Sequence, residues 1–301
     1  MSRTKNVLLT YVGCILFMVC GALIFLTGCT SERNISENLQ ILQLQASENL
    51  PQKLILTAPE HRVVLFHNST AAVVDGVPVL LHDPAMRSAD GRWDLAENSV
   101  RGILQPVLAH APFPIRRIVV DPGHGGHDNG AAAVNGRKEK ELNLELAKKI
   151  AASLRQCGFS VYMTRNSDKY LTLDARTACA KKLNADLFIS VHHNASAVNP
   201  DAAGMETFAL LVKDPAELSR TLPSLRLAYL VQKEQFGVNH SFGRGVKTAR
   251  FKVLRTAPCP AILIEAGFLT NAKDAFRCSD ARHQQKLADA VARAVRGFNA
   301  R

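Results

Sequence analysis

His124, Glu139, His192 and Glu265 are the residues of this 301-residue sequence whose types and positions suit them to chemistry. Each comes where a short apolar run stops or a helical pattern begins, so the four could converge at one edge of a sheet. Two imidazoles and a carboxylate are a common ligand set for a catalytic zinc ion, which keeps a fourth position for water. A further carboxylate nearby can act as the general base. The pattern predicts metal-assisted hydrolysis.

His124 lies in a glycine-rich stretch, Asp-Pro-Gly-His-Gly-Gly at 121–126, directly after a short apolar run. Glycines permit backbone turns that other residues resist, so this imidazole could project from the edge of a sheet. A phosphate-binding loop is excluded by the spacing, because Gly-x-Gly-x-x-Gly counted from Gly123 would require a glycine where Asp128 stands. The remaining alternative is a loop histidine without a role.

Glu139 opens a long amphipathic pattern, which predicts a helix over residues 139–156. A glutamate in the first helical turn also complements the helix dipole, so the sequence supports a metal ligand and a dipole partner equally. Glu141 is the competing carboxylate, but it lies two residues further on and therefore points elsewhere around the helix.

His192 and His193 end a strand pattern over residues 187–191. Successive residues of a strand face opposite sides, so only one of the two imidazoles can point where His124 points. The alternation along the strand favours His192 as the ligand, and it leaves His193 to orient the neighbourhood or to bind substrate.

Glu265 directly follows the apolar run 261–264. A carboxylate in such surroundings is costly to bury unless it is paired or linked to a metal. As a base it could take a proton from the attacking water and pass it to the leaving amine of an amide, provided that its pKa is raised towards neutrality. The alternative is a structural salt bridge to an arginine such as Arg165.

The elements that must position these residues alternate between strand and helix from residue 115 onwards. The expected strands are 118–121, 160–163, 187–191, 205–211 and 261–264, and the expected helices are 139–156, 173–182, 215–235 and 280–298. This alternation predicts an α/β domain over residues 115–301, with a mostly parallel twisted sheet flanked by helices. Ligands of such sheets gather at the carboxyl ends of the strands.

The stretch before this domain divides into two parts. Residues 61–110 contain short β-prone runs, and Asp75-Gly76 between two of them is a strong hairpin signal, so we expect a small β-rich module. Residues 29–60 are polar and rich in Ser, Asn, Gln and Glu, and we expect a flexible tether there with a short helix.

The N-terminus resembles a bacterial lipoprotein signal. Arg3 and Lys5 precede an uncharged, largely apolar run that ends in Leu-Thr-Gly-Cys at 26–29. The resemblance implies that residues 1–28 are removed and that Cys29 is lipidated. The alternative is an uncleaved membrane anchor, because about 20 apolar residues can span a bilayer. Both interpretations place the chain in the cell envelope, tethered to a membrane and facing the periplasm.

Composition and charge narrow the classes of partner. A net charge of +11 predicts attraction to anionic surfaces, but the basic residues are scattered and form no nucleic-acid-binding signature, so we expect no nucleic-acid partner. After removal of the signal, four cysteines would remain beside the one at the new N-terminus. Two disulfides and four free thiols are both open for this group, which consists of Cys157, Cys179, Cys259 and Cys278.

Taken together, the motifs over residues 115–300 resemble those of the zinc-dependent N-acetylmuramoyl-L-alanine amidases, a cell-wall family that includes bacterial cell-separation enzymes active in cell division. The resemblance rests on Asp-Pro-Gly-His-Gly-Gly at 121–126, Glu-Lys-Glu-Leu-Asn-Leu at 139–144, Ser-Val-His-His-Asn at 190–194 and Ile-Glu-Ala-Gly-Phe-Leu-Thr-Asn at 264–271. It implies one zinc ion held by His124, Glu139 and His192, with Glu265 as the catalytic residue.

The family resemblance also implies a substrate, which is the amide between N-acetylmuramic acid and the L-alanine of the peptidoglycan stem peptide. Asn194 and Arg244 are then expected to bind substrate, and the protein is expected to be a monomer. The stretch between Glu206 and Arg244 offers one helix and no second segment to plug the site, which argues against regulation by displacement of such a plug. The alternatives are a zinc peptidase that cuts within the stem peptide and a non-catalytic wall-binding lipoprotein.

Overall fold

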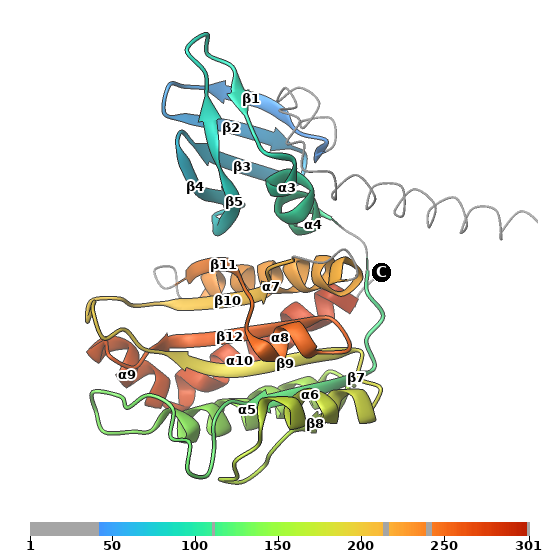
Figure 1. Cartoon of the computed structure of the whole chain (residues 1–301), viewed down its shortest axis with the longest axis vertical. Helices are drawn as coiled ribbons and strands as arrows, with labels where there is room; N and C mark the ends of the chain where they lie inside the picture. The colour runs from blue at the N-terminus through green and yellow to red at the C-terminus, as the bar shows by residue number, and fades with distance from the viewer. Residues whose placement is uncertain (1–41, 110–111, 213–216, 239–242, 300–301) are drawn as a thin grey trace, which may run out of the picture.

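The computed structural model of this chain describes residues 42–109, 112–212, 217–238 and 243–299. Its strands form one extended sheet in the order β1-β2-β3-β4-β5-β11-β10-β12-β9-β7-β8, with β6 beside β5 (Figure 1). The N-terminal strands are β1 (Gln45–Asn49), β2 (Lys53–Ala58), β3 (His61–Phe66), β4 (Ser69–Val74), β5 (Val77–Arg87) and β6 (Trp93–Asp94). The later strands are β7 (Arg117–Pro122), β8 (Ser160–Met163), β9 (Leu187–Asn194), β10 (Met205–Leu210), β11 (Gly243–Ala249) and β12 (Ala261–Phe268).

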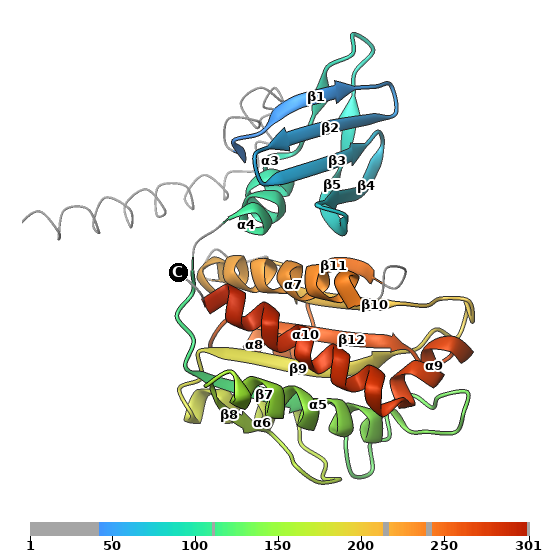
Figure 2. The ribbon, with the colours of Figure 1, turned by 180° about the vertical axis from the view of Figure 1, so that it is seen from behind.

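Helices cover both faces of the C-terminal part of the sheet. Figure 2 shows α5, α7 and α10 in front of one face, and Figure 1 shows α6 and α8 in front of the other. The bounds of these helices and of α9 at the sheet edge are α5 (Glu139–Gln156), α6 (Leu173–Lys182), α7 (Leu218–Val238), α8 (Lys252–Thr256), α9 (Ala272–Ser279) and α10 (Ala281–Asn299). Strands covered on both sides have no solvated face, and this explains why runs such as 118–120 and 261–264 are apolar throughout.

The C-terminal sheet confirms the expected α/β fold. Neighbouring strands are parallel from β8 through β7, β9 and β12, and β10 and β11 are parallel to each other. Only the β10–β12 pair is antiparallel among the described strands of this part. The carboxyl ends of β7, β9 and β12 therefore meet the amino ends of β10 and β11 at one edge, which is where the four residues of interest lie.

The apolar pattern of α5 shows why this helix forms and where it packs. Its side chains at 142, 146, 150 and 154 are fully buried. Those at 146, 150 and 154 join a core that also contains residues of α10, and Leu142 packs in a smaller cluster with Leu269. The helix ends before Gly158, which has a φ of +90° and so continues the chain in a conformation that side chains resist. Packing of α5 against the sheet brings its first residue, Glu139, to the carboxyl ends of the strands.

The N-terminal part forms a β-rich module, but it begins earlier than expected. Residues 45–58, which we expected to belong to the tether, form β1 and β2 in antiparallel register with β3. The run Leu54-Ile-Leu56 is buried against the module, and the burial of this apolar surface accounts for β2. β1 is exposed and is held by its pairing with β2. The hairpin at Asp75-Gly76 is confirmed, because Val74 pairs with Val77 and both turn residues have positive φ.

A short helical stretch follows the module. It consists of α3 (Glu97–Ser99), a π-helical turn (Val100–Leu104) and α4 (Gln105–Leu108). The buried residues of this stretch belong to the same core as residues of α7 and of the module strands. The module and the C-terminal domain are thus packed together rather than separated by a solvated gap.

Several details differ from expectation. Strands β9 and β12 continue three and four residues beyond their expected ends, and β11 was not expected at all. Each of the four cysteines considered above is a free thiol, so the disulfide alternative is wrong. Within the described residues no helix is long and apolar enough to cross a membrane. The expected signal and the lipidation site Cys29 lie outside the described part of the chain.

Candidate functional site

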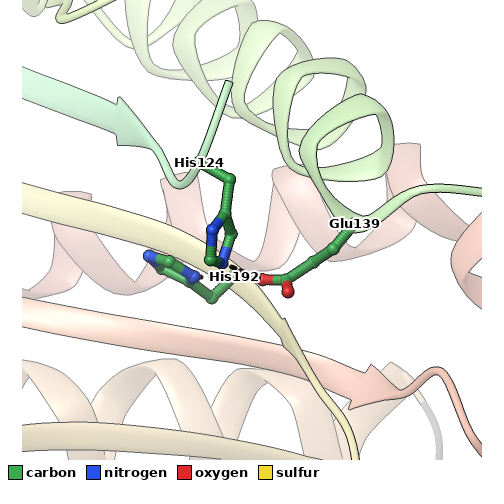
Figure 3. A group of neighbouring side chains, drawn as sticks. All are labelled: His124, Glu139 and His192. Atoms are coloured by element: carbon green, nitrogen blue, oxygen red, sulfur yellow. Dashed lines mark hydrogen bonds and ion pairs between the residues drawn. The ribbon is translucent and has the colours of Figure 1, made fainter. Parts of the chain in front are cut away.

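His124, Glu139 and His192 come together at the sheet edge, with their side chains pointing at one another (Figure 3). His124 Nε2 and His192 Nδ1 each lie 3.1 Å from the same oxygen, Oε1 of Glu139. One potential ligand atom from each residue lies within 4.8 Å of the other two. Tetrahedral zinc with bonds of about 2.0–2.2 Å holds its ligand atoms roughly 3.3 Å apart. The three side chains therefore have the separation and the donor types of a zinc site.

The loop that carries His124 is held from behind by two buried arginines. Arg176 donates from Nη2 to the carbonyl of His124 at 2.8 Å and from Nη1 to the carbonyl of Pro122 at 2.7 Å. Arg165 donates from Nη2 to the carbonyl of Gly123 at 2.7 Å. His124 itself has a φ of +59°, an unfavourable conformation for a residue with a side chain. The arginine hydrogen bonds offset this strain and fix the direction in which the imidazole projects.

Two glycines are required by the cluster itself. A Cβ at Gly123 would lie 2.1 Å from Cε1 of His192, and a Cβ at Gly130 would lie 2.5 Å from Oε2 of Glu139. Both distances are far below van der Waals contact, so any larger residue would displace the side chain that it meets. The glycine-rich sequence thus serves close packing around the histidines and the glutamate.

A second layer of hydrogen bonds orients His124 and Glu139. Asp128 Oδ2 lies 2.8 Å from Nδ1 of His124, which leaves Nε2 of that ring facing the cluster. The Ala131 N–H donates to Oε2 of Glu139 at 2.9 Å, and Asn143 donates from Nδ2 to Oε1 at 3.1 Å. Partners of this kind fix the tautomer and the direction of metal ligands.

The charges of the cluster are strongly coupled. Burial alone would raise the pKa of Glu139, but hydrogen bonds and charge from His124 and His192 hold it well below its usual value. Burial alone would lower the pKa of His124, but Glu139 and then Asp128 raise it to about 9. Glu141 takes no part, because its carboxylate pairs with Arg137 at 3.2 Å. Glu139 is therefore an anionic ligand candidate as well as a first-turn residue.

His193 points away from the cluster. Along β9, even-numbered residues share the face of Phe188 and odd-numbered residues share the face of Ile189, so His192 and His193 lie on opposite faces. Asn143 uses its Nδ2 to donate to two oxygens, so its Oδ1 accepts from Nδ1 of His193 at 2.7 Å. Burial lowers the pKa of His193 to about 4, so this ring is neutral. His193 thus orients Asn143, which in turn contacts Glu139.

Glu265 lies in the strand next to His192 and shares its face. The two residues are register partners in the β12–β9 pair, and Glu206 is the register partner of Glu265 in the β10–β12 pair. The Oε2 atom of Glu265 is buried and has no hydrogen-bond partner among the described residues. Burial, followed by the charges of Glu139 and Glu206, raises the pKa of Glu265 to about 8. Such a carboxyl group can exchange a proton near neutral pH.

The alternative salt bridge for Glu265 is not formed. Arg165, the suggested partner, instead donates to the backbone carbonyls of Pro122, Gly123, Lys140 and Ser167. Its guanidinium group is engaged behind the metal loop and does not neutralise Glu265. The catalytic interpretation of Glu265 is therefore the one that its surroundings favour.

Asn194 and Arg244 meet at Glu206, to which the sequence alone assigns no role. Asn194 donates from Nδ2 to Oε2 of Glu206 at 3.2 Å, and Arg244 and Lys247 both bind Oε1. The guanidinium group of Arg244 lies 5.1 Å from the centre of the Phe268 ring. The signal that could have identified Glu206 is its position at the start of a strand beside Glu265, but this requires the strand order, which the sequence does not give.

Comparisons with known proteins identify the family of the C-terminal domain. Residues 118–297 match the family described as N-acetylmuramoyl-L-alanine amidase. The amidase LytC of Bacillus subtilis is 37% identical over 175 residues, covering 58% of this chain and 34% of that longer protein. The amidase AmiA of Escherichia coli is 31% identical over 217 residues, covering 60% of this chain and 75% of AmiA.

Solved structures give the same result. The amidase AmiC2 of Nostoc punctiforme superimposes with a TM-score of 0.55 at 33% sequence identity, covering 60% of this chain and 94% of that one. The matched family region contains all four residues of the His124, Glu139, His192 and Glu265 set. The chain belongs to the N-acetylmuramoyl-L-alanine amidase family of cell-wall hydrolases.

Proposed function

We propose that this protein is a zinc-dependent amidase that hydrolyses the bond between N-acetylmuramic acid and the L-alanine of the peptidoglycan stem peptide. The observation that carries the proposal is the convergence of His124, Glu139 and His192 beside a buried, unpaired carboxylate on the adjacent strand. Family membership indicates the substrate class, and the types of the three donor atoms indicate zinc as the metal.

The three proposed ligands suit zinc in particular. Two imidazole nitrogens and one carboxylate oxygen form a set that zinc favours, and Asp128 supports the His124 ring as an outer partner. Zinc bound there would supply Lewis-acid activation of the scissile carbonyl and of the attacking water. The task of the protein side chains is to hold the ligand atoms in place and to move protons.

Glu265 is the residue that we assign to proton transfer. In its ionised form it accepts a proton from the water whose oxygen attacks the lactyl carbonyl carbon. As the C–N bond breaks, Glu265 returns a proton to the nitrogen of L-alanine, which leaves as a free amine, while the lactyl group becomes a carboxylate. Burial is the largest cause that raises the pKa of Glu265, and a raised pKa suits both directions of this transfer.

We assign substrate binding to the residues around Glu206, which lies next to Glu265 on the side away from His192. Asn194 and Arg244 surround Glu206, and Arg244 is 41% exposed, so it can contact a bound peptide as well as Glu206. The Phe268 ring, whose centre lies 5.1 Å from the guanidinium group, holds that group by a cation–π contact.

We also propose that the enzyme acts at the cell envelope from a membrane tether. The support is the sequence resemblance of the first 29 residues to a lipoprotein signal, with Cys29 as the lipidated residue. Mass spectrometry of the N-terminal peptide from the native host tests this. A diacylglyceryl mass on Cys29 is the expected result, and an unmodified segment 1–28 in the mature chain would contradict it.

The proposed reaction is tested by digesting purified peptidoglycan and identifying the fragments by mass spectrometry. We expect intact stem peptides with a free L-alanine amino group and glycan strands without peptide. Cleavage inside the stem peptide would instead identify a peptidase, and zinc-loaded protein without any product would identify a wall-binding protein.

Two histidine variants link the reaction to the metal. His192→Ala should lose both zinc and activity, since it removes one of three ligands. His127→Ala is the matched control, because His127 stacks on Tyr170 with ring centres 4.1 Å apart and lies outside the cluster. This control should retain zinc at one ion per chain, as measured by atomic emission.

A further inference from the structure

The N-terminal module extends the sheet of the catalytic domain at its β11 edge. β5 and β11 run parallel, with Val79 as the register partner of Val246. Figures 1 and 2 show the module beside β11 and α7, on the opposite side of the domain from β8. The match to the AmiC2 structure covers 94% of that chain but only 60% of this one, so AmiC2 has little that could correspond to the module.

A partly buried hydrogen bond joins the two parts. Tyr229 of α7 is fully buried and donates from its hydroxyl to Oδ2 of Asp75, at 2.6 Å, in the turn between β4 and β5. Asp75 is fixed in turn by His61 Nδ1 at 2.8 Å and by the N–H of Arg62 at 2.8 Å. From the same helix, Arg226 donates to the carbonyl of Val107 in α4. Helix α7 therefore contacts both the β4–β5 turn of the module and the helical stretch that follows the module.

The backbones of β11 and β5 approach each other closely at Gly245. Gly245 has a φ of +85°, and a Cβ there would lie 2.0 Å from the carbonyl oxygen of Pro78 in β5. A residue with a side chain would be strained at this φ and would also push β5 away. Gly245 is thus required both by the close contact between β5 and β11 and by its own positive φ.

The strand at this joint also carries two cations of the proposed active site. Arg244 and Lys247 flank the pair Gly245-Val246 and bind Oε1 of Glu206, which is the register partner of Glu265. On one side β11 is held by β10, and on the other it is held by β5 of the module. Loss of the module contact would leave β11 as a free edge strand with the substrate-facing cations on it.

We propose that the N-terminal module is a positioning element of the active site: its contact with α7 and β11 holds Arg244 and Lys247 against Glu206 in the arrangement that binds the stem peptide. Tyr229 and Asp75 are positioning residues, because they touch neither the metal cluster nor the substrate-facing groups. The role of the two cations in binding rests on the proposed amidase function.

The test uses the full-length zinc enzyme with Tyr229→Phe and Asp75→Asn. Phenylalanine keeps the buried ring and removes only the hydroxyl that binds Asp75. Asparagine tolerates the φ of +50° at position 75 and removes the charge that binds Tyr229, but it also weakens the contacts of Asp75 with His61 and with the N–H of Arg62. Tyr162→Phe is the matched control, since Tyr162 is 42% exposed on β8 at the other edge of the sheet. Hydrogen exchange of the β11 amides and steady-state kinetics on peptidoglycan fragments are measured for each protein.

We expect the β11 amides to exchange about tenfold faster in both variants, because a hydrogen bond to a charged group is worth about that factor. The amides of β7 should be unchanged, zinc should stay at one ion per chain, and KM should rise about tenfold with kcat nearly constant. The Tyr162→Phe control should match the wild type in every measurement.

Two results would overturn the proposal. One is wild-type exchange in β11 together with wild-type KM in both variants. The other is faster exchange in every strand with loss of zinc, which would mean that the hydrogen bond only stabilises the fold. If the wild-type protein had no amidase activity, the proposed function would fail, and β11 exchange alone would then decide whether the module holds this strand.

Discussion

Replacing Gly123 with alanine is the sharpest test of the proposed zinc site, because it alters the site without touching a ligand. The new Cβ would lie 2.1 Å from Cε1, 2.3 Å from Nε2 and 2.6 Å from Nδ1 of His192. Ordinary contact begins at 3.4 Å, so the imidazole has to move by about 1.3 Å. Metal–ligand distances tolerate only about 0.2 Å. The variant should therefore lose His192 as a ligand.

The expected magnitude follows from this displacement. Loss of an outer partner of a metal ligand typically weakens metal binding by about 10–100-fold, and displacement of the ligand itself should exceed the upper end of that range. We expect zinc affinity to fall at least about 100-fold and amidase activity to fall with it. The fold should persist, since Gly123 is at the sheet edge and the buried strands around it keep their contacts.

The assay is competition for zinc against a chelator of known affinity, with circular dichroism to confirm folding. Gly297→Ala is the matched control, because nothing lies within 4 Å of a Cβ at this helical position. It should bind zinc normally and should unfold at a slightly higher temperature, because alanine is favoured over glycine in a helix by about 0.5–1 kcal/mol. Wild-type zinc affinity in a folded Gly123→Ala protein would refute the placement of His192 in the metal site.

Three further predictions concern the other residues of the site. Glu265→Gln should lower kcat by about 10²–10⁴-fold while zinc stays bound, as measured by kinetics and metal analysis, and near-normal turnover would remove Glu265 from the mechanism. In metal-free protein, the pKa of Glu265 is raised from its ordinary value of 4.5 to about 8, so its contribution to stability should be complete below pH 4.5 and should be lost as the pH rises to about 8. Urea unfolding at a series of pH values should show this loss of stability in the wild type and not in Glu265→Gln. Asp128→Asn should weaken zinc binding about 10–100-fold, because it removes the carboxylate that orients His124, and an unchanged chelator titration would show that the carboxylate is dispensable.

Much of the fold could be predicted from local patterns, because the relevant elements are regular and buried. The helix 139–156 and the strand 160–163 have the bounds that were expected, since each combines a clear apolar period with a glycine or a polar stop. Strand β11 could not be predicted in this way. Its sequence Gly-Arg-Gly-Val-Lys-Thr-Ala has few apolar residues, and it forms a strand because β10 and β5 pair with it on both sides.

The candidate site was predictable to a similar degree. Strand alternation was sufficient to separate His192 from His193, and the ends of three strands were sufficient to place His124 and Glu265 near each other. Glu206 and Asn143 could not be given roles in the same way. Their functions depend on which strands and helices are neighbours, and hydrogen bonds between elements distant in the chain leave no local pattern.

The buried arginines behind the metal loop have a consequence for protein engineering. A designer who copied Asp-Pro-Gly-His-Gly-Gly to the end of a parallel strand in another scaffold would transfer an imidazole without the groups that grip its backbone. Arg165 and Arg176 come from the segments after β8 and within α6, far from the loop in sequence. Without them His124 would relax from its positive φ and turn its ring elsewhere. The smallest transferable unit of this half-site is therefore the whole of β7 through α6, and the six-residue motif alone should be inert when grafted.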